Sequence, residues 1–288
     1  MGLRARVKKY LKHISLKVEK VDTPVMYGSL LEGRTALITG GTSGIGFAIA
    51  AACARNGASV VITGRASARI ASALEALRSE VDGAQVAGVI LDSSSNDIAL
   101  FSRALDEAER LIGSPVNVLV NNAGVIAGGN MPNTEIEGFD LTIDTNLRGA
   151  YFLSQEFGRR LHDAKRSGNI LNICSSSSLR PAISPYTISK WGLRGLTLGL
   201  AKQLAPLGVT VNGLAPGPTA TPMLMADGND NLVHDGLPIG RYATPDEIAN
   251  MAVVLVSDLG RMVVGDIVYM TGGGGTVTFD DMSYAYPL

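Results

Sequence analysis

The sequence has few of the residues that build disulfide frameworks or metal sites. Its 288 residues include 2 cysteines, 3 histidines and 1 tryptophan. Cys53 and Cys174 lie in apolar segments, where a thiol packs as a small hydrophobic group, and they do not make a disulfide framework. The histidines, His13, His162 and His234, form no cluster with cysteines or carboxylates at metal-ligand spacing, so we expect no metal site.

An excess of charge of one sign and long apolar runs are also missing. The formal net charge of −1 gives the chain no overall attraction to nucleic acids. No run approaches the roughly 18 apolar residues of a membrane-spanning helix, and no secretory segment precedes the fold. With 46% hydrophobic and 18% charged residues, the chain is typical of one soluble domain with a substantial core. We expect a cytoplasmic protein.

Residues 1–32 differ from the rest of the chain. Apolar residues recur there at helical spacing, and lysines and arginines fill the positions between them, which predicts a basic amphipathic helix. Such a helix can bind an anionic membrane surface or a partner. It can also lie on its own domain or on a neighbouring subunit. We favour the second interpretation, because one helix without large aromatic residues anchors weakly.

From residue 33 to residue 288, apolar strand-like runs alternate with helix-like segments. The expected strands span residues 35–39, 59–63, 85–91, 116–121, 169–174, 209–214 and 267–270. The expected helices span residues 45–56, 67–79, 97–112, 139–165, 185–205 and 245–255. The strands are short and apolar on both faces, as parallel strands covered by helices are. The pattern predicts an α/β fold with a Rossmann-type, doubly wound parallel sheet of about seven strands in a single domain.

One glycine-rich turn indicates a phosphate site. Residues 39–46 read Thr-Gly-Gly-Thr-Ser-Gly-Ile-Gly, after an apolar run and before an alanine-rich helical segment. Glycine lets the backbone come close to a pyrophosphate. The first N–H groups of the following helix supply donors at the positive end of its dipole. Strand, glycine turn and helix in this order therefore predict binding of a dinucleotide.

Four further motifs accompany this turn. They are Asn121-Asn-Ala-Gly124, Asn146, Tyr186-x-x-x-Lys190 and Pro216-Gly217. Together with the glycine turn, the set resembles the short-chain dehydrogenase/reductase family, and the likeness covers roughly residues 33–275. The resemblance implies an oxidoreductase that acts on CH–OH groups with NAD or NADP.

The end of the second expected strand bears on the choice of cofactor. An NAD-selective site usually places a carboxylate there, to accept hydrogen bonds from the ribose hydroxyls. This chain has Gly64 at that position and Arg65 after it, and Ser43 in the glycine turn offers a hydroxyl. A guanidinium can pair with a 2′-phosphate. We therefore predict that NADP(H) is preferred over NAD(H).

The resemblance implies a set of cofactor contacts along the chain. Asp92 would contact the adenine amino group, and Thr221 would lie near the nicotinamide carboxamide, with Thr219 as a lesser candidate. The whole implied set is Gly40, Thr42, Ser43, Gly44, Ile45, Gly46, Arg65, Asp92, Asn121, Ala123, Gly124, Tyr186, Lys190, Pro216, Gly217, Thr219 and Thr221.

Tyr186 and Lys190 are four residues apart in an expected helix, so both side chains project from one face. Reduction of a ketone needs a hydride at carbon and a proton at oxygen. A tyrosine with an ordinary pKa of about 10 is a poor acid near neutrality, and a neighbouring ammonium group lowers that value. The resemblance makes Tyr186 the general acid of reduction and the base of oxidation. Lys190 tunes it and holds the nicotinamide ribose.

Two more catalytic residues follow from the resemblance. Ser175 matches the serine that holds the carbonyl oxygen, although four consecutive serines leave Ser176 as the next candidate. Asn146 matches an asparagine that bends its helix and holds a water between the lysine and solvent. Residues 218–240 would form a lid over the substrate.

The leading hypothesis is therefore an NADP(H)-dependent enzyme that interconverts a small-molecule carbonyl compound and a secondary alcohol. The family often forms tetramers, so we expect a homotetramer, or otherwise a dimer. One rival is a catalytically silent dinucleotide-binding regulatory or scaffold protein. Another, suggested by the basic residues 1–32, is a membrane-associated reductase of a lipid-like ketone. The sequence does not choose the substrate.

Overall fold

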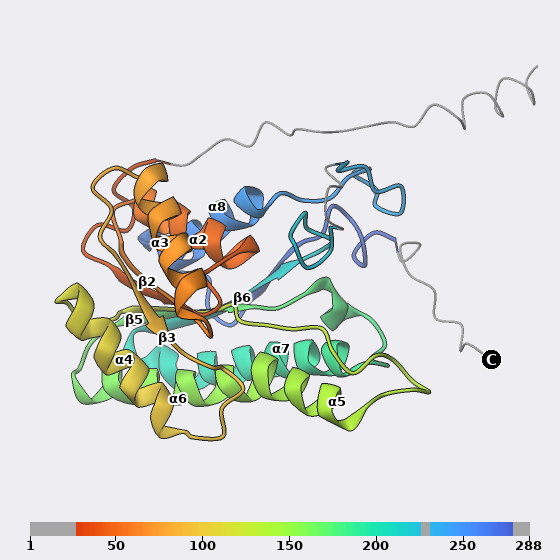
Figure 1. Ribbon diagram of the computed structural model, residues 1–288, viewed down its shortest axis with the longest axis horizontal. Helices are drawn as coiled ribbons and strands as arrows, with labels where there is room; N and C mark the ends of the chain where they lie inside the picture. Colours follow the sequence, from red (N-terminus) through yellow and green to blue (C-terminus); the bar gives the residue numbers. More distant parts are fainter. Residues whose placement is uncertain (1–26, 226–230, 279–288) are drawn as a thin grey trace, which may run out of the picture.

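Among the described residues, 27–225 and 231–278, seven strands form one parallel sheet at the centre of this computed structural model (Figure 1). The strands are β1 (Thr35–Ile38), β2 (Ser59–Gly64), β3 (Val86–Ile90), β4 (Val118–Asn121), β5 (Gly168–Ile173), β6 (Val209–Pro216) and β7 (Ile267–Met270). Their order is β3-β2-β1-β4-β5-β6-β7, and every neighbouring pair is parallel. This confirms the predicted doubly wound sheet. Most of the predicted basic extension lies outside the described residues.

Helices cover both faces of the sheet (Figure 1). The helices on one face are α2 (Gly44–Arg55), α3 (Ser67–Glu80) and α8 (Pro245–Val256). Those on the other face are α4 (Ala99–Ile112), α6 (Gly149–Asp163) and α7 (Pro185–Leu204). The short helix α5 (Ile136–Ile143) precedes α6 along the chain.

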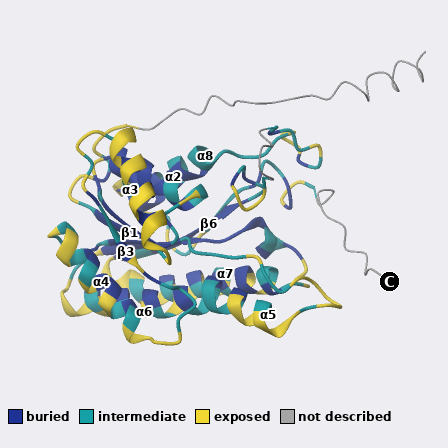
Figure 2. Cartoon of the chain, in the orientation of Figure 1, coloured by how far each residue is buried: buried dark blue, intermediate teal, exposed yellow. Residues whose placement is uncertain are grey.

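The side chains of each strand alternate between two hydrophobic clusters. In β1, Ala36 and Ile38 join the cluster that includes α2 and α8, whereas Leu37 joins the cluster that includes α4 and α6. All three side chains are fully buried. Figure 2 shows the buried faces of the helices turned toward the sheet and their exposed faces turned away. Because both faces of the sheet are covered, the strands are apolar on both sides, as the sequence predicted.

The predicted helix over residues 139–165 is wrong as one continuous element. The structure has α5, then a π-helical turn at Asp144–Arg148, and then α6. A π turn inserts an extra residue into the helical repeat, which helical periodicity does not reveal. Asn146 lies in this turn and is buried, so the predicted local bend is a change of helix type.

The segment predicted as a lid is described except for residues 226–230. Isolated bridges join Thr219 to Ala243 and Val233 to Arg241, so two parts of the segment pair with residues just before α8. Within the described ranges, no helix has both the length and the apolar character needed to cross a bilayer.

Candidate active site

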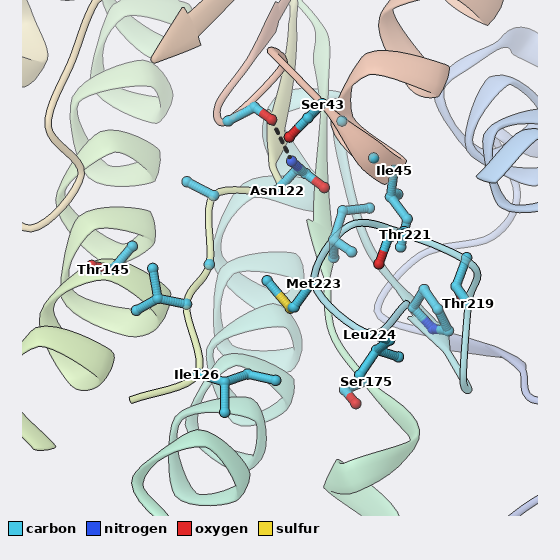
Figure 3. Close-up of a pocket in the computed structure, with 18 of the residues that line it drawn as sticks. Ser43, Ile45, Asn122, Ile126, Thr145, Ser175, Thr219, Thr221, Met223 and Leu224 are labelled. Atoms are coloured by element: carbon cyan, nitrogen blue, oxygen red, sulfur yellow. Dashed lines mark hydrogen bonds between the residues drawn. The ribbon is translucent and has the colours of Figure 1, made fainter. Parts of the chain in front are cut away.

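A cavity of about 740 Å³ lies at the carboxyl ends of the strands. The chain leaves β1 toward β2 on one side of the sheet and reaches β4 on the other, and open α/β sheets bind ligands at such a switch point. The cavity is lined by residues that follow each of the strands β1 to β6. Figure 3 shows side chains from these separate segments converging on one space.

The glycine turn forms a cradle at one end of this cavity. Gly44 has a φ of +55°, which favours glycine. A Cβ on Gly40 would lie 3.0 Å from Cα of Ala123, and a Cβ on Gly46 would overlap the Asn122 amide and the Gly40 carbonyl. A larger residue at Gly40 or Gly46 would have to displace these neighbours, so glycine lets the turn pack closely against the segment after β4.

The helix that follows this turn leaves its first N–H groups available to a ligand. Ser43 is the N-cap of α2 and lines the cavity, and in the described structure its side chain makes no capping hydrogen bond. Gly44, Ile45 and Gly46 line the cavity too. Their N–H groups belong to the set that lacks partners within the helix. An anion is favoured at this end of the helix dipole.

At the end of β2 the cavity wall is cationic. Gly64, Arg65 and Thr42 all line it, as predicted or implied from the sequence. A Cβ on Gly64 would lie 2.9 Å from Cγ2 of Thr42, so glycine brings β2 close to the glycine turn. Arg69, in the first turn of α3, also lines the cavity and was missed. Its position four residues after Arg65 would have placed it on the same side of the helix start.

The predicted cofactor contact of Asn121 is not what the structure shows. Asn121 does not line the cavity, whereas Asn122 does. The Asn121 amide is buried and donates to Ser154 Oγ at 2.9 Å and to Asn172 Oδ1 at 2.8 Å. Successive side chains at the end of a strand point to opposite sides. Asn121 is therefore buried in the protein, whereas the next residue, Asn122, lies at the cavity.

Asn122 takes the place expected of its neighbour. Its Nδ2 donates to the carbonyl oxygens of Thr39 at 2.9 Å and Gly40 at 3.2 Å, and the second bond is visible in Figure 3. These bonds tie the end of β4 to the glycine turn. Asp92 lines the cavity after β3, where its carboxylate accepts from Ser94 N and Oγ.

Ser175 follows β5 and faces the cavity (Figure 3). Its Oγ accepts from Ser177 N at 3.1 Å and so caps a short 3₁₀ helix, Ser176–Leu179. Ser176 lines the cavity too, but its Oγ accepts from Nη1 of Arg180 at 3.0 Å. Both serines therefore line the cavity, and their hydroxyl groups have different hydrogen-bond partners.

Tyr186 and Lys190 lie in the first turns of α7. This helix begins at Pro185, and the Ser184 side chain caps it by accepting from Thr187 N at 3.2 Å. Both Tyr186 and Lys190 line the cavity. Lys190 Nζ donates to the Ile173 carbonyl at 2.8 Å and lies 5.7 Å from the centre of the Tyr186 ring. The helix thus brings a hydroxyl and a buried ammonium group to one wall.

Asn146 lies behind the cavity wall. Its Nδ2 donates to the Val125 carbonyl at 3.0 Å and to Ser189 Oγ at 3.0 Å, and its Oδ1 accepts from Val125 N at 2.8 Å. These bonds hold the segment after β4 against the start of α7. The proton-relay role implied for Asn146 stays a prediction.

The segment after β6 closes the remaining side. Pro216, Gly217, Thr219 and Thr221 line the cavity, as expected. Met223 and Leu224 also line the cavity, and Figure 3 shows them in the same region as Ile126 and Ser175, so apolar side chains face the presumed substrate. His234 lines the cavity as well, and its ring packs edge-on against Tyr242 at 4.8 Å.

Burial makes the cysteine nearest the reactive groups a poor nucleophile. Cys174 lines the cavity between Ile173 and Ser175, and burial raises the pKa of its thiol to about 11. The thiol is therefore protonated near neutrality. No group of three or more histidines, cysteines or carboxylates able to hold a metal ion occurs in the part of the chain that the structure describes.

Comparison with known proteins agrees with this geometry. A family model described as enoyl-(acyl carrier protein) reductase matches residues 40–274. The 3-oxoacyl-(acyl-carrier-protein) reductase FabG of Aquifex aeolicus is 31% identical over 247 residues, covering 84% of this chain and 98% of its own. Gluconate 5-dehydrogenase of Gluconobacter oxydans is 33% identical over 249 residues, covering 84% of this chain and 95% of its own.

A solved structure shares both the fold and the sequence pattern. A short chain dehydrogenase from Burkholderia cenocepacia in complex with NADP is 31% identical, with a TM-score of 0.75 and coverage of 85% of this chain and 98% of its own. This chain belongs to the short-chain dehydrogenase/reductase family, a family of oxidoreductases that act on CH–OH groups. A nicotinamide dinucleotide fits the glycine cradle and the open helix end described above.

Proposed function

We propose that this enzyme interconverts a carbonyl compound and a secondary alcohol with NADP(H), and that Tyr186 is its proton donor and acceptor. The observation that carries the proposal is the joint position of Ser175, Tyr186 and Lys190 on one cavity with the glycine cradle. Hydroxyl, phenol and ammonium groups from β5 and α7 meet there, although 11 positions separate the serine from the tyrosine. When bound, the nicotinamide cofactor supplies or accepts the hydride.

The roles of the three side chains follow from their chemistry. Ser175 donates a hydrogen bond to the carbonyl oxygen and fixes its orientation. Tyr186 gives its hydroxyl proton to that oxygen as negative charge develops there, and takes the proton back in the reverse direction. The Lys190 ammonium, 5.7 Å from the tyrosine ring, stabilises the resulting phenolate.

The hydrogen bond from Lys190 to the Ile173 carbonyl keeps the ammonium in place. The side chain is buried, so its charge is screened less by water than a surface charge would be. The π turn at Asp144–Arg148 positions Asn146 behind this arrangement. Asn146 holds the start of α7 through its hydrogen bond to Ser189. We assign it to the path by which a proton returns from solvent to the active site through Lys190.

The end of β2 supports NADP(H) over NAD(H). Gly64 places no carboxylate near the 2′ position, and Arg65 and Arg69 both line the cavity there. A guanidinium forms strong, paired hydrogen bonds with a phosphate group. The structure of the Burkholderia cenocepacia relative was determined with NADP, which agrees with this choice.

Substitution of the proton donor tests the proposal. We expect Tyr186→Phe to lower kcat for NADPH-dependent carbonyl reduction by about 10² to 10⁴, the usual contribution of a positioned acid–base group. NADPH binding should remain, because the ring is kept. The reaction is followed by the loss of NADPH absorbance over a panel of aldehydes and ketones.

Tyr151→Phe is the matched control, since Tyr151 lies on α6 with its side chain about half exposed and does not line the cavity. It should retain wild-type rates. Full activity of Tyr186→Phe would remove Tyr186 from the mechanism. A wild-type protein that binds NADPH but reduces no carbonyl would favour the silent dinucleotide-binding protein instead.

A further inference from the structure

Arg148 is a residue of the π turn whose side chain the roles above do not use. Its Nη1 pairs with the Asp144 carboxylate at 3.0 Å on the same helix, and its Nη2 donates to the main-chain carbonyl of Ser94. Ser94 lies 54 positions earlier in the chain, in the segment after β3. The second contact therefore joins the π turn to a segment that forms another wall of the cavity.

The segment after β3 is a tight turn that presents a carboxylate to the cavity. Asp92 and Ser93 line the cavity, and the Asp92 carboxylate accepts from Ser94 N at 3.0 Å and from Ser94 Oγ at 2.7 Å. Ser95 N donates to the Asp92 carbonyl at 3.1 Å. The orientation of the carboxylate thus depends on where the main chain at Ser94 is held.

The start of α6 packs directly against the same turn. Gly149 is the first residue of α6, and a Cβ at this position would overlap the Ser93 carbonyl oxygen. Glycine therefore lets the helix backbone come close to the main chain of Ser93. The Arg148 guanidinium contacts the next residue, Ser94. Two successive residues of this helix thus hold two successive residues of the turn after β3.

The π turn also contacts the catalytic wall on its other side. Asn146, two positions before Arg148, donates to Ser189 Oγ at 3.0 Å in the first turns of α7. Side chains two positions apart on a helix point to nearly opposite sides. One helical turn therefore lies between the start of α7, which carries the proposed proton donor, and the segment that carries Asp92.

The position of Asp92 fits the adenine end of a bound dinucleotide. The glycine cradle after β1 fits the pyrophosphate, and Arg65 and Arg69 line the cavity after β2. In the sheet β3 follows β2, on the side away from β5 and the reactive serines. Asp92 is the only carboxylate among the described residues that line the cavity. An ionised carboxylate only accepts hydrogen bonds, and the 6-amino group is the one donor that the adenine ring of a dinucleotide offers.

We propose that Arg148 is a positioning residue for the adenine ring of the cofactor. By holding the Ser94 carbonyl, it keeps the Asp92 carboxylate oriented to accept a hydrogen bond from the 6-amino group. This rests on the proposed function, because it assigns a further residue to the same cofactor site. Arg148 does not line the cavity and acts through Ser94 and Asp92.

An ion pair on the surface of the helix is the competing explanation. Asp144 and Arg148 are four residues apart, and such a pair stabilises a helix only slightly. Its loss would loosen the π turn and weaken the binding of every dinucleotide alike. Loss of the adenine contact would instead affect only a dinucleotide that carries the 6-amino group. Two cofactors that differ at this one group therefore separate the two explanations.

The test measures Kd by calorimetry on the full-length enzyme with NADPH and with deamino-NADPH, in which a carbonyl replaces the 6-amino group of the adenine. We expect the wild type to bind NADPH at least about fivefold more tightly, because the carbonyl cannot donate to Asp92. Arg148→Met and Asp92→Asn should each reduce this preference to less than about twofold. Arg148→Gln, with a shorter side chain and no guanidinium, should show the same loss, and it decides the outcome if Arg148→Met does not fold.

Arg159→Met is the matched control. Arg159 also pairs with carboxylates three and four residues away, Glu156 and Asp163, but it lies on the exposed side of α6 and does not line the cavity. This variant should keep the wild-type preference. A wild type that binds both cofactors equally, or an Arg148→Met variant that keeps the full preference, would overturn the proposal.

The same measurement separates this proposal from the proposed function, because binding does not depend on turnover. If NADPH binds but no carbonyl is reduced, the proposed function fails, and the role of Arg148 stands if Arg148→Met loses the preference. If carbonyls are reduced and the preference survives the substitution, the proposed function stands and this role fails. If neither dinucleotide binds, both fail.

Discussion

Neighbouring residues of this protein can have very different roles. Asn121 is buried in a polar network with Ser154 and Asn172, and Asn122 holds the glycine turn. The motif led to the prediction that Asn121 contacts the cofactor, but which asparagine faces the cavity depends on the register at the end of β4, which packing decides. Arg180 is buried and lines the cavity, and it gave no signal in the sequence, because a single sequence does not show which distant segments pack together.

The two cysteines lead to a prediction about the reactivity of single side chains. Burial raises the pKa of Cys53 to about 12 and that of Cys174 to about 11. At pH 8 only roughly one thousandth of Cys174 would then be thiolate, the form that reacts. We expect labelling by a thiol reagent to be slow in the native protein and fast for both thiols after denaturation.

The control for this experiment is Ser79→Cys, at an exposed position near the end of α3. One thiol of that variant should react at once under native conditions. Fast labelling of the native wild type would show that Cys53 or Cys174 is accessible, contrary to the structure.

Whole helices and strands followed the sequence closely, because burial on both faces leaves a pattern in the chain. The predicted strands all occur, and their ends move by at most two residues. The prediction of one continuous helix over residues 139–165 was wrong. The π turn at Asp144–Arg148 adds a residue to the helix without interrupting its apolar pattern. Periodicity identifies elements reliably and does not detect such local changes.

The start of α8 carries a prediction on pH. The Arg241 side chain bonds both carboxylate oxygens of Glu247, at 2.9 Å and 2.8 Å, and holds the pKa of Glu247 below its ordinary value. Glu247 also completes a capping box with Thr244. Because the folded pKa is lowered, this stabilisation is present above the unfolded pKa of about 4.3. It is lost as the pH falls through the folded value.

We therefore expect Glu247→Gln to lower the free energy of unfolding by about 1–2 kcal/mol at pH 7, the range of a helix cap joined to a charged hydrogen bond. The difference from wild type should shrink toward pH 3. Urea denaturation at the two pH values measures it, with Glu75→Gln, at an exposed position on α3, as a surface control. A constant difference across this range would contradict the assignment.

The molecule as a whole has the fold of its family, with one cavity at the carboxyl ends of the strands. Composition and strand–helix alternation predicted the sheet, and the fold brings nearly all of the predicted cofactor residues to one cavity. His234 reaches this cavity from a distant segment and was not assigned a role, because a single sequence does not reveal long-range contacts. The homotetramer, the cytoplasmic location and the movement of the lid stay predictions.

Binding of the cofactor tests the central claim most directly. A ligand that binds only the folded state raises its stability by RT ln(1 + [L]/Kd), or about 2.7 kcal/mol at a hundredfold excess over Kd. Thermal unfolding of the wild type, of Arg65→Ala and of the control Arg110→Ala, which lies on the exposed side of α4, is measured with NADPH and with NADH. We predict a rise in Tm of roughly 5 °C or more with NADPH and a smaller rise with NADH. Arg65→Ala should lose the difference, and Arg110→Ala should keep it. An equal or larger shift with NADH would contradict the cofactor assignment, and no shift with either dinucleotide would contradict the account of the cavity itself.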